Sequence, residues 1–185
     1  RVLKPGGELY FSDVFADRRL PNWCKEDPVL LGECLGGAMY TEDFRRLMAK
    51  LGVLDFRIIA KSPISLNTDE IENKVGHVNF SSITFRAFKM ELEDRCEDYG
   101  QVAVYKGTIP GAPHAFRLDD HHNFKSHTPL QVCRNTSKML SGSRFGKHFE
   151  ILGSSEFHLG LFDCSPLVGN AQAAAIPAPA PGGCC

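Results

Sequence analysis

The stretch Leu3-Lys-Pro-Gly-Gly-Glu-Leu-Tyr-Phe-Ser12 decides the fold class of this chain. Residues 1–7 are typical of a helix end followed by a tight glycine turn, and residues 8–12 of an apolar strand. A helix end, a glycine turn and a buried strand form the step that recurs in doubly wound α/β sheets. A domain seldom begins this way, so we expect an α/β fold whose earlier strands lie upstream of Arg1.

The pattern continues outward from this strand as alternating helices and strands. Apolar side chains spaced three and four residues apart predict a helix from Thr41, its N-cap, to Gly52. These apolar positions are Phe44, Leu47, Met48 and Leu51. We also expect a strand at 53–60, a short helix at 69–75 that stops at Gly76, and a strand at 81–89.

Beyond residue 90 the apolar residues become sparser, and we expect a second, small α+β unit over about residues 95–168. A strand is predicted at 101–106, and a helix at 136–149 that Gly142 weakens. Residues 169–185 have almost nothing to bury and are rich in Ala and Pro, so we expect a disordered tail ending in Cys184-Cys185.

Composition excludes several classes of protein. Lys and Arg number 21 against 22 Asp and Glu, for a net charge of −1, so no positive field attracts nucleic acid. No apolar run approaches the roughly 18 to 20 residues of a membrane span, and we expect no membrane partner. The seven cysteines are odd in number and include no CxxC pair, which argues against a disulfide scaffold and predicts reduced thiols in the cytoplasm.

Two motifs carry a resemblance to a known family. The stretch from Leu3 to Val14 resembles the step into the fifth strand of class I S-adenosylmethionine-dependent methyltransferases. The stretch Leu31-Gly-Glu-Cys-Leu-Gly-Gly-Ala-Met-Tyr40 resembles the signature of arsenite methyltransferases, and the nearest resemblance is to the eukaryotic, algal-type enzymes. It continues through residues 84–89, 97–107 and 143–145 and covers most of residues 1–165.

The resemblance implies a fold and an activity. Residues 1–90 would be the carboxy-terminal half of a Rossmann-like methyltransferase domain with its substrate-binding region, and residues 95–168 its small α+β C-terminal domain. S-adenosylmethionine would donate methyl groups to thiol-bound trivalent arsenic, giving methylated arsenicals in arsenic detoxification, with a thiol reductant such as glutathione or thioredoxin. No Gly-x-Gly-x-x-Gly occurs here, so the cofactor-binding residues would lie upstream and the chain alone would be inactive. We expect a monomer.

Cys34 is the candidate catalytic and substrate-binding residue, as a ligand of arsenic. Trivalent arsenic is a soft centre, and soft thiolates suit it. Two or three sulfurs leave its lone pair free to attack the sulfonium methyl in line, so a dry pocket would supply positioning and no general base is needed. Gly36 and Gly37 would let a partner element or ligand approach closely, or simply cap a helix. Without the resemblance, a buried packing cysteine is the commoner case.

The sequence departs from the family at one point. The family takes a second thiolate from the segment that here runs from Gly76 to Phe85 and contains no cysteine, and a third from upstream. His77 could substitute, but its nitrogen is a harder ligand, and a loop histidine facing solvent is the commoner case.

The remaining candidates receive a structural interpretation. We expect Cys24, Cys96 and Cys133 to have no catalytic role. Cys184 and Cys185 could bind arsenic, exchange disulfides or do nothing. His121 and His122, beside Asp119 and Asp120, could chelate a metal in principle, but a solvated turn is expected because adjacent side chains diverge.

Two alternatives stay open. One is a class I methyltransferase for another small molecule, which gains weight from the missing thiolate near His77. The other is a non-catalytic module that binds trivalent arsenic through Cys34 and the tail thiols.

Overall fold

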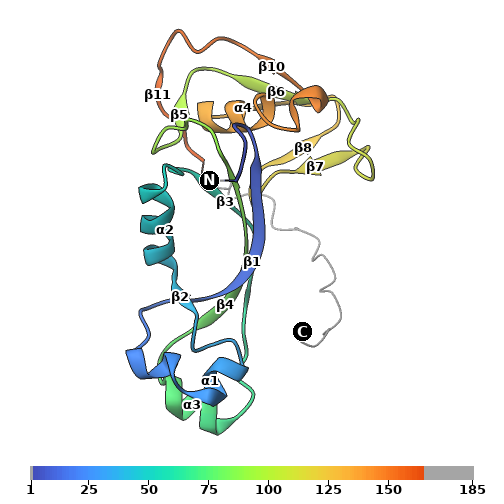
Figure 1. Ribbon diagram of the computed structural model, residues 1–185. Coiled ribbons are helices and arrows are strands. Elements are labelled where there is room, and N and C mark those ends of the chain that lie inside the picture. Colours follow the sequence, from blue (N-terminus) through green and yellow to red (C-terminus); the bar gives the residue numbers. More distant parts are fainter. Residues whose placement is uncertain (1, 165–185) are drawn as a thin grey trace.

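The computed structural model describes residues 2–164 and is shown in Figure 1. Arg1, the expected tail at 169–185 and its Cys184-Cys185 pair lie outside the described residues. Within the described residues, no helix is both long and apolar enough to cross a bilayer.

A four-stranded sheet in the order β2-β1-β4-β3 forms the first unit. Its long central strands, β1 (Glu8–Ala16) and β4 (Phe80–Phe88), pair antiparallel along their whole length. On the far side of β4 lies the antiparallel β3 (Phe56–Pro63), whereas β2 (Met39–Tyr40) pairs in parallel with β1. The α/β class is confirmed. In this four-stranded sheet β1 and β2 are the one parallel pair, because β4 lies between β1 and β3 and is antiparallel to both.

Two apolar clusters pack against this sheet at different places. α2 (Thr41–Lys50) covers one face and buries Phe44 and Met48 against aromatic side chains of the sheet. At the lower end of Figure 1, η1 (Asn22–Lys25), α1 (Pro28–Gly32) and α3 (Asp69–Val75) surround a second cluster. We call this second apolar cluster the lower cluster, and the end of the sheet where it lies the lower end.

The locally encoded elements of this half agree with the sequence. α3 matches the predicted helix at 69–75, and α2 matches its predicted helix to within a residue or two. The N-cap prediction was wrong, because Tyr40 precedes the helix and the Thr41 hydroxyl donates to the Ala16 carbonyl at 3.2 Å, tying α2 to β1. Leu47 and Leu51 are exposed, although the periodicity placed them on the buried face.

Two boundaries differ from prediction. The strand expected at 53–60 lies at Phe56–Pro63 instead. Residues 2–7 contain no helical turn and form a loop around Gly6 (φ 74°), whose N–H donates to the Lys89 carbonyl at 2.8 Å. This hydrogen bond holds the loop to the end of β4, and residues 2–7 do not include the helix end that the sequence predicted there.

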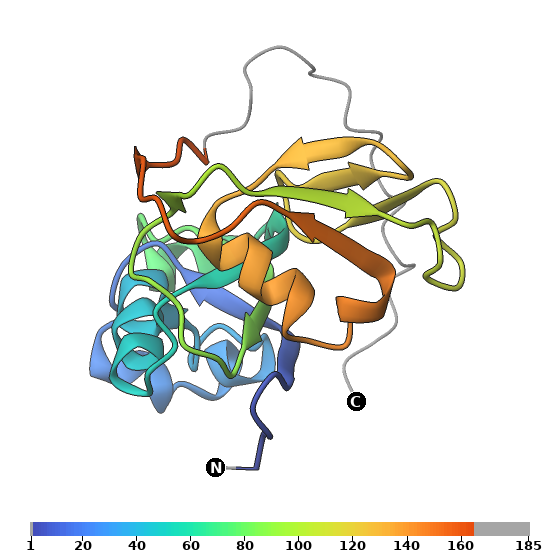
Figure 2. The same cartoon turned by 90° about the horizontal axis from the view of Figure 1, so that it is seen from above.

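The second unit is built on a three-stranded antiparallel sheet of order β10-β6-β9. The strands are β6 (Val102–Tyr105), β9 (Pro129–Gln131) and β10 (Phe149–Leu152). Two further pairs flank it: β5 (Glu97–Asp98) with β11 (Gly160–Leu161), and β7 (Ala115–Arg117) with β8 (Asn123–Lys125). α4 (Arg134–Ser141) lies beside β10 and β6 in Figure 2, and η2 (Gly146–His148) leads into β10.

The helix predicted at 136–149 was wrong in its second half. α4 ends before Gly142, which is its C-cap, and Phe149 begins β10. The reason is tertiary: Phe149 is 4% exposed and packs against Tyr105 of the neighbouring strand, with ring centroids 5.1 Å apart. The strand predicted at 101–106 is β6.

Gly36 shows the close backbone approach that the sequence indicated. A Cβ at Gly36 would overlap the carbonyl oxygen of Cys24, whereas a Cβ at Gly37 would meet no heavy atom within 4 Å. Gly36 therefore lets the segment after α1 lie against η1.

We expect Gly36→Ala to lower the free energy of unfolding by about 1–3 kcal/mol, because a backbone carbonyl cannot rotate away from the added methyl. Gly37→Ala is the matched control and should change stability little. Urea denaturation of both variants measures the difference, and equal effects at the two positions would contradict the proposed contact.

Candidate functional site

Cys34 lies at the end of α1 in an unusual backbone conformation. The side chain of Asp27 caps the start of the helix, and the N–H groups of Leu35 and Gly36 both donate to the Leu30 carbonyl at 2.8 Å. These bonds close the helix end with Cys34 at φ 60°, in the left-handed region where glycine is the usual residue. The Cys34 side chain is exposed.

Cys34 is not the buried packing cysteine that is the commoner case, because its side chain is exposed. Leu30 and Leu35 fill the lower cluster instead, at 0% and 3% exposure. A cysteine in the left-handed region costs about 1–2 kcal/mol relative to the right-handed form, and Cys34 offsets none of this by burial. The expected dry pocket also differs from what is found, since Cys34 lies at the surface of the described chain.

The segment that lacks the second cysteine lies at the same end of the sheet. Lys74 of α3 reaches across to Asp27 at 2.8 Å, and Val75, Val78 and Phe80 pack in the cluster that holds Leu30 and Leu35. His77, in the turn after α3, is exposed, as the sequence predicted. The chain therefore brings residues 76–80 to the end of the sheet that carries Cys34.

Cys24 has the environment of a packing residue. It is 1% exposed and lies in the same lower cluster. Burial raises the pKa of the Cys24 thiol, which keeps it protonated and unreactive at neutral pH.

A second cluster of sulfurs was not anticipated from the sequence. The sulfur atoms of Cys96, Cys133 and Cys164 all lie within 4.8 Å of one another. Cys96 precedes β5, Cys133 is the N-cap of α4, and Cys164 follows β11. We call this group the thiol triad. The interpretation of Cys96 and Cys133 as residues without a role does not account for this convergence.

The hydrogen bonds among the three thiols shift their pKa values in opposite directions. Hydrogen bonds from Cys164 and Cys96 lower the pKa of Cys133 well below its usual range, and an N–H from Thr136 adds to the effect. Donation to Cys133 raises the pKa of Cys96 to about 11 and that of Cys164 further. These hydrogen bonds favour the thiolate form of Cys133 over that of Cys96 or Cys164.

A buried arginine lies beside the triad. Arg57 of β3 is 4% exposed and donates to Asp55 at 2.8 Å, to Asp119 at 3.1 Å and to the Thr136 hydroxyl at 3.1 Å. Nη2, the guanidinium nitrogen that donates to Asp55 and Thr136, also lies 3.9 Å from the Cys133 sulfur. One cation from the four-stranded sheet thus contacts polar groups on both sides of the junction between the two units.

The expectation of a solvated turn at residues 119–122 was wrong for two of its four members. Asp119 is 0% exposed, and its carboxylate accepts from Arg57, from the N–H of His122 at 2.6 Å and from His122 Nδ1 at 2.8 Å. His122 is 5% exposed. His121 and Asp120 do lie at the surface, 2.6 Å apart. Both Asp119 oxygens already accept strong hydrogen bonds, which favours a structural role over metal binding.

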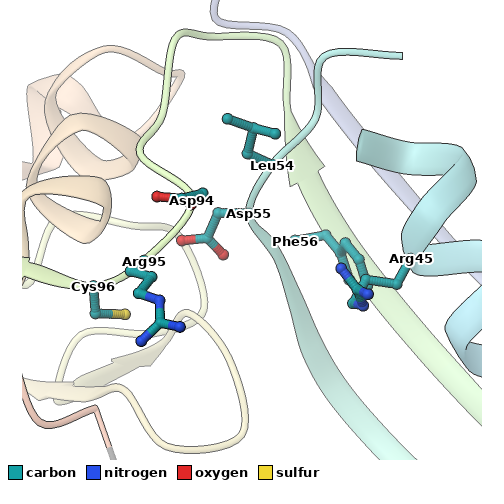
Figure 3. Close-up of a pocket in the computed structure, with 7 residues that line it drawn as sticks. All are labelled: Arg45, Leu54, Asp55, Phe56, Asp94, Arg95 and Cys96. Carbon is teal, nitrogen blue, oxygen red and sulfur yellow. The ribbon is translucent and has the colours of Figure 1, made fainter. Parts of the chain in front are cut away.

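A shallow pocket of about 220 Å³ opens next to the triad. Figure 3 shows its lining residues, contributed by α2, by the start of β3 and by the segment before β5: Arg45, Leu54, Asp55, Phe56, Asp94, Arg95 and Cys96. Cys96 belongs to both the pocket and the triad, so the pocket borders the sulfur cluster at this residue.

Comparison with known proteins gives consistent results. The family model "Arsenite methyltransferase C-terminal domain" matches residues 98–165. An arsenite methyltransferase of Aquipseudomonas alcaligenes is 50% identical over 164 residues, which are 88% of this chain and 47% of the relative. Arsenite methyltransferase of Homo sapiens is 37% identical over 154 residues, 82% of this chain and 40% of the relative.

A solved structure is also similar. The crystal structure of CrArsM, an arsenic (III) S-adenosylmethionine methyltransferase from Chlamydomonas reinhardtii, is 52% identical with a TM-score of 0.83, covering 88% of this chain and 55% of that one. The chain spans about half the length of these relatives. Its identities to the Aquipseudomonas and the Chlamydomonas proteins are nearly equal, so the similarity does not single out the algal type.

We expect Arg57→Met to destabilise the protein by about 3–5 kcal/mol, because it leaves the buried carboxylate of Asp119 without its cation. Burial alone would raise the pKa of Asp119, but hydrogen bonds from His122 and the charge of Arg57 lower it below its unfolded value. This stabilisation is present above the unfolded pKa of about 3.9 and is lost as the pH falls. In Arg57→Met the pKa of Asp119 should be lowered less, so the loss of stability on acidification should begin at a higher pH.

Urea denaturation of the variant and the parent protein between about pH 3 and about pH 7 measures both effects. Arg46→Met is the matched control, because Arg46 is half exposed and pairs with Asp43 at the surface. It should leave stability and its pH dependence nearly unchanged. A similar response in the two variants would argue against the Arg57 network as the main polar contact of the junction.

Proposed function

Because the chain is homologous to the carboxy-terminal region of arsenite methyltransferases, we propose that the protein it belongs to methylates trivalent arsenic. S-adenosylmethionine supplies the methyl group, and the products are methylated arsenicals, as arsenic detoxification requires. The 50% identity to an arsenite methyltransferase over most of this chain supports the proposal. In it, residues 1–90 complete the methyltransferase domain and residues 95–168 form the C-terminal domain.

Cys34 is the arsenic ligand in this proposal, and its backbone conformation is the observation that carries the assignment. An exposed cysteine stands where glycine would remove the strain. Such left-handed positions occur often at functional sites, and a thiolate is the ligand that soft trivalent arsenic prefers. Cys34 therefore holds the arsenic while its lone pair attacks the sulfonium methyl in line.

Other components follow from the chemistry. The attack consumes the arsenic lone pair, so the methylated product is pentavalent, and two thiols of a reductant such as glutathione or thioredoxin return it to the trivalent state by forming one disulfide. Because thiol reductants are kept reduced in the cytosol, we expect the reaction to take place there. Since the 185 residues contain no Gly-x-Gly-x-x-Gly, we assign none of them to the cofactor and expect no cofactor binding by this chain alone.

One observation favours a second candidate. Residues 76–85 contain no cysteine, so the Cys34 end of the sheet has one thiolate fewer than the family pattern. A class I methyltransferase for another small molecule would need neither thiolate. Replacement of Cys34 distinguishes the two functions.

Cys34→Ser should lower the turnover of arsenite and methylarsenite by orders of magnitude in the intact enzyme, while cofactor affinity changes only a few-fold, because the lost contact is to the substrate. Cys34→Gly should lose turnover equally and yet be as stable or more stable, since glycine relieves the left-handed strain. Steady-state methylation, cofactor titration and urea denaturation measure these effects.

Cys24→Ala is the control, because Cys24 is buried in the core and should affect stability rather than rate. Near-normal turnover in Cys34→Ser would move the assignment to the methyltransferase of another substrate.

Introducing a second thiol tests the departure near His77. Val78→Cys should raise activity on arsenite, because Val78 packs in the cluster beneath Cys34. Ile83→Cys should not, since Ile83 is 1% exposed and belongs to the cluster under α2. Initial rates of both variants give the answer, and equal rates in Val78→Cys and the parent enzyme would indicate that another group already completes the site.

A further inference from the structure

The thiol triad lies in the second unit, outside the site built around Cys34. In Figure 1, α1 lies at the lower end of the four-stranded sheet, and α4 and β5, which flank Cys133 and Cys96, lie at the upper end. We propose that Cys96, Cys133 and Cys164 form a second binding site for trivalent arsenic, specific for unmethylated arsenite. The identity of the ligand rests on the proposed function, whereas the site itself rests on the geometry below.

Separate parts of the backbone position the three sulfurs. The Cys96 carbonyl accepts from the N–H of Phe162 at 2.8 Å, which continues the β5–β11 pairing and brings Cys164 alongside. The segment before Cys96 is held to α4, because Asn135 bonds both the N–H and the carbonyl of Glu93 at 2.8 Å. The triad is thus fixed before any ligand arrives, which limits the entropy lost on binding.

Three sulfurs suit arsenite in number. Arsenite, As(OH)₃, exchanges each hydroxyl for a thiolate, so three As–S bonds form, three As–O bonds break, and the three thiol protons leave in three water molecules. The oxidation state of arsenic does not change. A structural zinc ion normally takes four ligands, and among residues 2–164 no fourth Cys, His, Asp or Glu joins this group.

The arsenic complex with three thiolates is neutral, so it places no net charge beside the Arg57 guanidinium, which lies 3.9 Å from the Cys133 sulfur.

The ligand has a route to the sulfurs. Cys96 and Cys164 are each partly exposed, and Cys133 is buried behind them. Cys96 also lines the pocket of Figure 3, whose volume of about 220 Å³ accommodates a molecule as small as arsenite. Arsenite therefore meets Cys96 from the pocket before it reaches Cys133.

The number of sulfurs sets the specificity. Methylarsenite has two exchangeable hydroxyls and dimethylarsinous acid has one, so each methyl group leaves one more thiol of the triad unbonded. The site accordingly holds the substrate of the first methylation and releases its products.

The experiment uses the intact protein under a phosphine reductant, with Cys34→Ser as the starting variant so that the proposed catalytic ligand is removed. Arsenite binding is measured by equilibrium dialysis with arsenic analysis, and sulfur coordination by X-ray absorption. Cys96→Ser and Cys164→Ser, each added to Cys34→Ser, should weaken one arsenite site on the order of 100-fold, because the third thiolate acts at high effective concentration. Cys24→Ala in the same background should not. Methylarsenite should bind this site on the order of 100-fold more weakly than arsenite.

Several results would overturn the proposal. They are unchanged arsenite binding in folded Cys96→Ser and Cys164→Ser, one equivalent of zinc that depends on these cysteines and resists arsenite, or a phosphine-resistant disulfide among them. Cys133→Ser is secondary, because it also alters the α4 cap, and urea denaturation checks that the other variants fold. Failure of the proposed function is separate: full turnover in Cys34→Ser would remove Cys34 as a ligand and leave the binding result standing.

Discussion

Arg57 of β3, together with Arg86 of β4, ties the four-stranded sheet to the second unit, since Arg86 is also buried and donates to the Leu118 carbonyl. The Arg57 guanidinium is 4% exposed and contacts Asp55 beside β3, Asp119 of the second unit and the Thr136 hydroxyl of α4. A buried cation is tolerated only where its hydrogen bonds and counter-charges are supplied with good geometry. These buried contacts restrict how the second unit lies against the sheet, and the Cys133 sulfur is among them. The same network explains why Asp119 and His122 are buried although their sequence resembles a surface turn.

Elements with a complete local signal were predictable. The helix at 69–75 has an N-cap, acidic residues in its first turn and a glycine stop, and the structure reproduces it residue for residue. Predictions failed where a distant partner decides the outcome. The prolonged helix at 136–149 stops because Phe149 pairs in a sheet with Tyr105, and Thr41 bonds the Ala16 carbonyl rather than capping its own helix.

The candidate sites divide in the same way. Cys34 could be proposed as a ligand from the sequence because its neighbours form a recognisable continuous motif, although its exposure and left-handed backbone were not visible there. The thiol triad was missed because its three cysteines are far apart in the chain and meet through β5 and β11, which have two residues each. Strands this short carry no periodicity, so their pairing gives no signal before the fold is known.

The junction also limits how the chain can be divided. The family match begins at residue 98, after Cys96 and well after Arg57. Excision at that boundary would keep most of the apolar core around Tyr105 and Met139, yet it would strip Asp119 of its cation and leave two sulfurs of three. The region that matches the family model is therefore smaller than the region in which the buried charge of Asp119 is paired, because Arg57 lies before residue 98. A piece of this fold that keeps the counter-charge of Asp119 must therefore include β3, although β3 belongs to the other sheet.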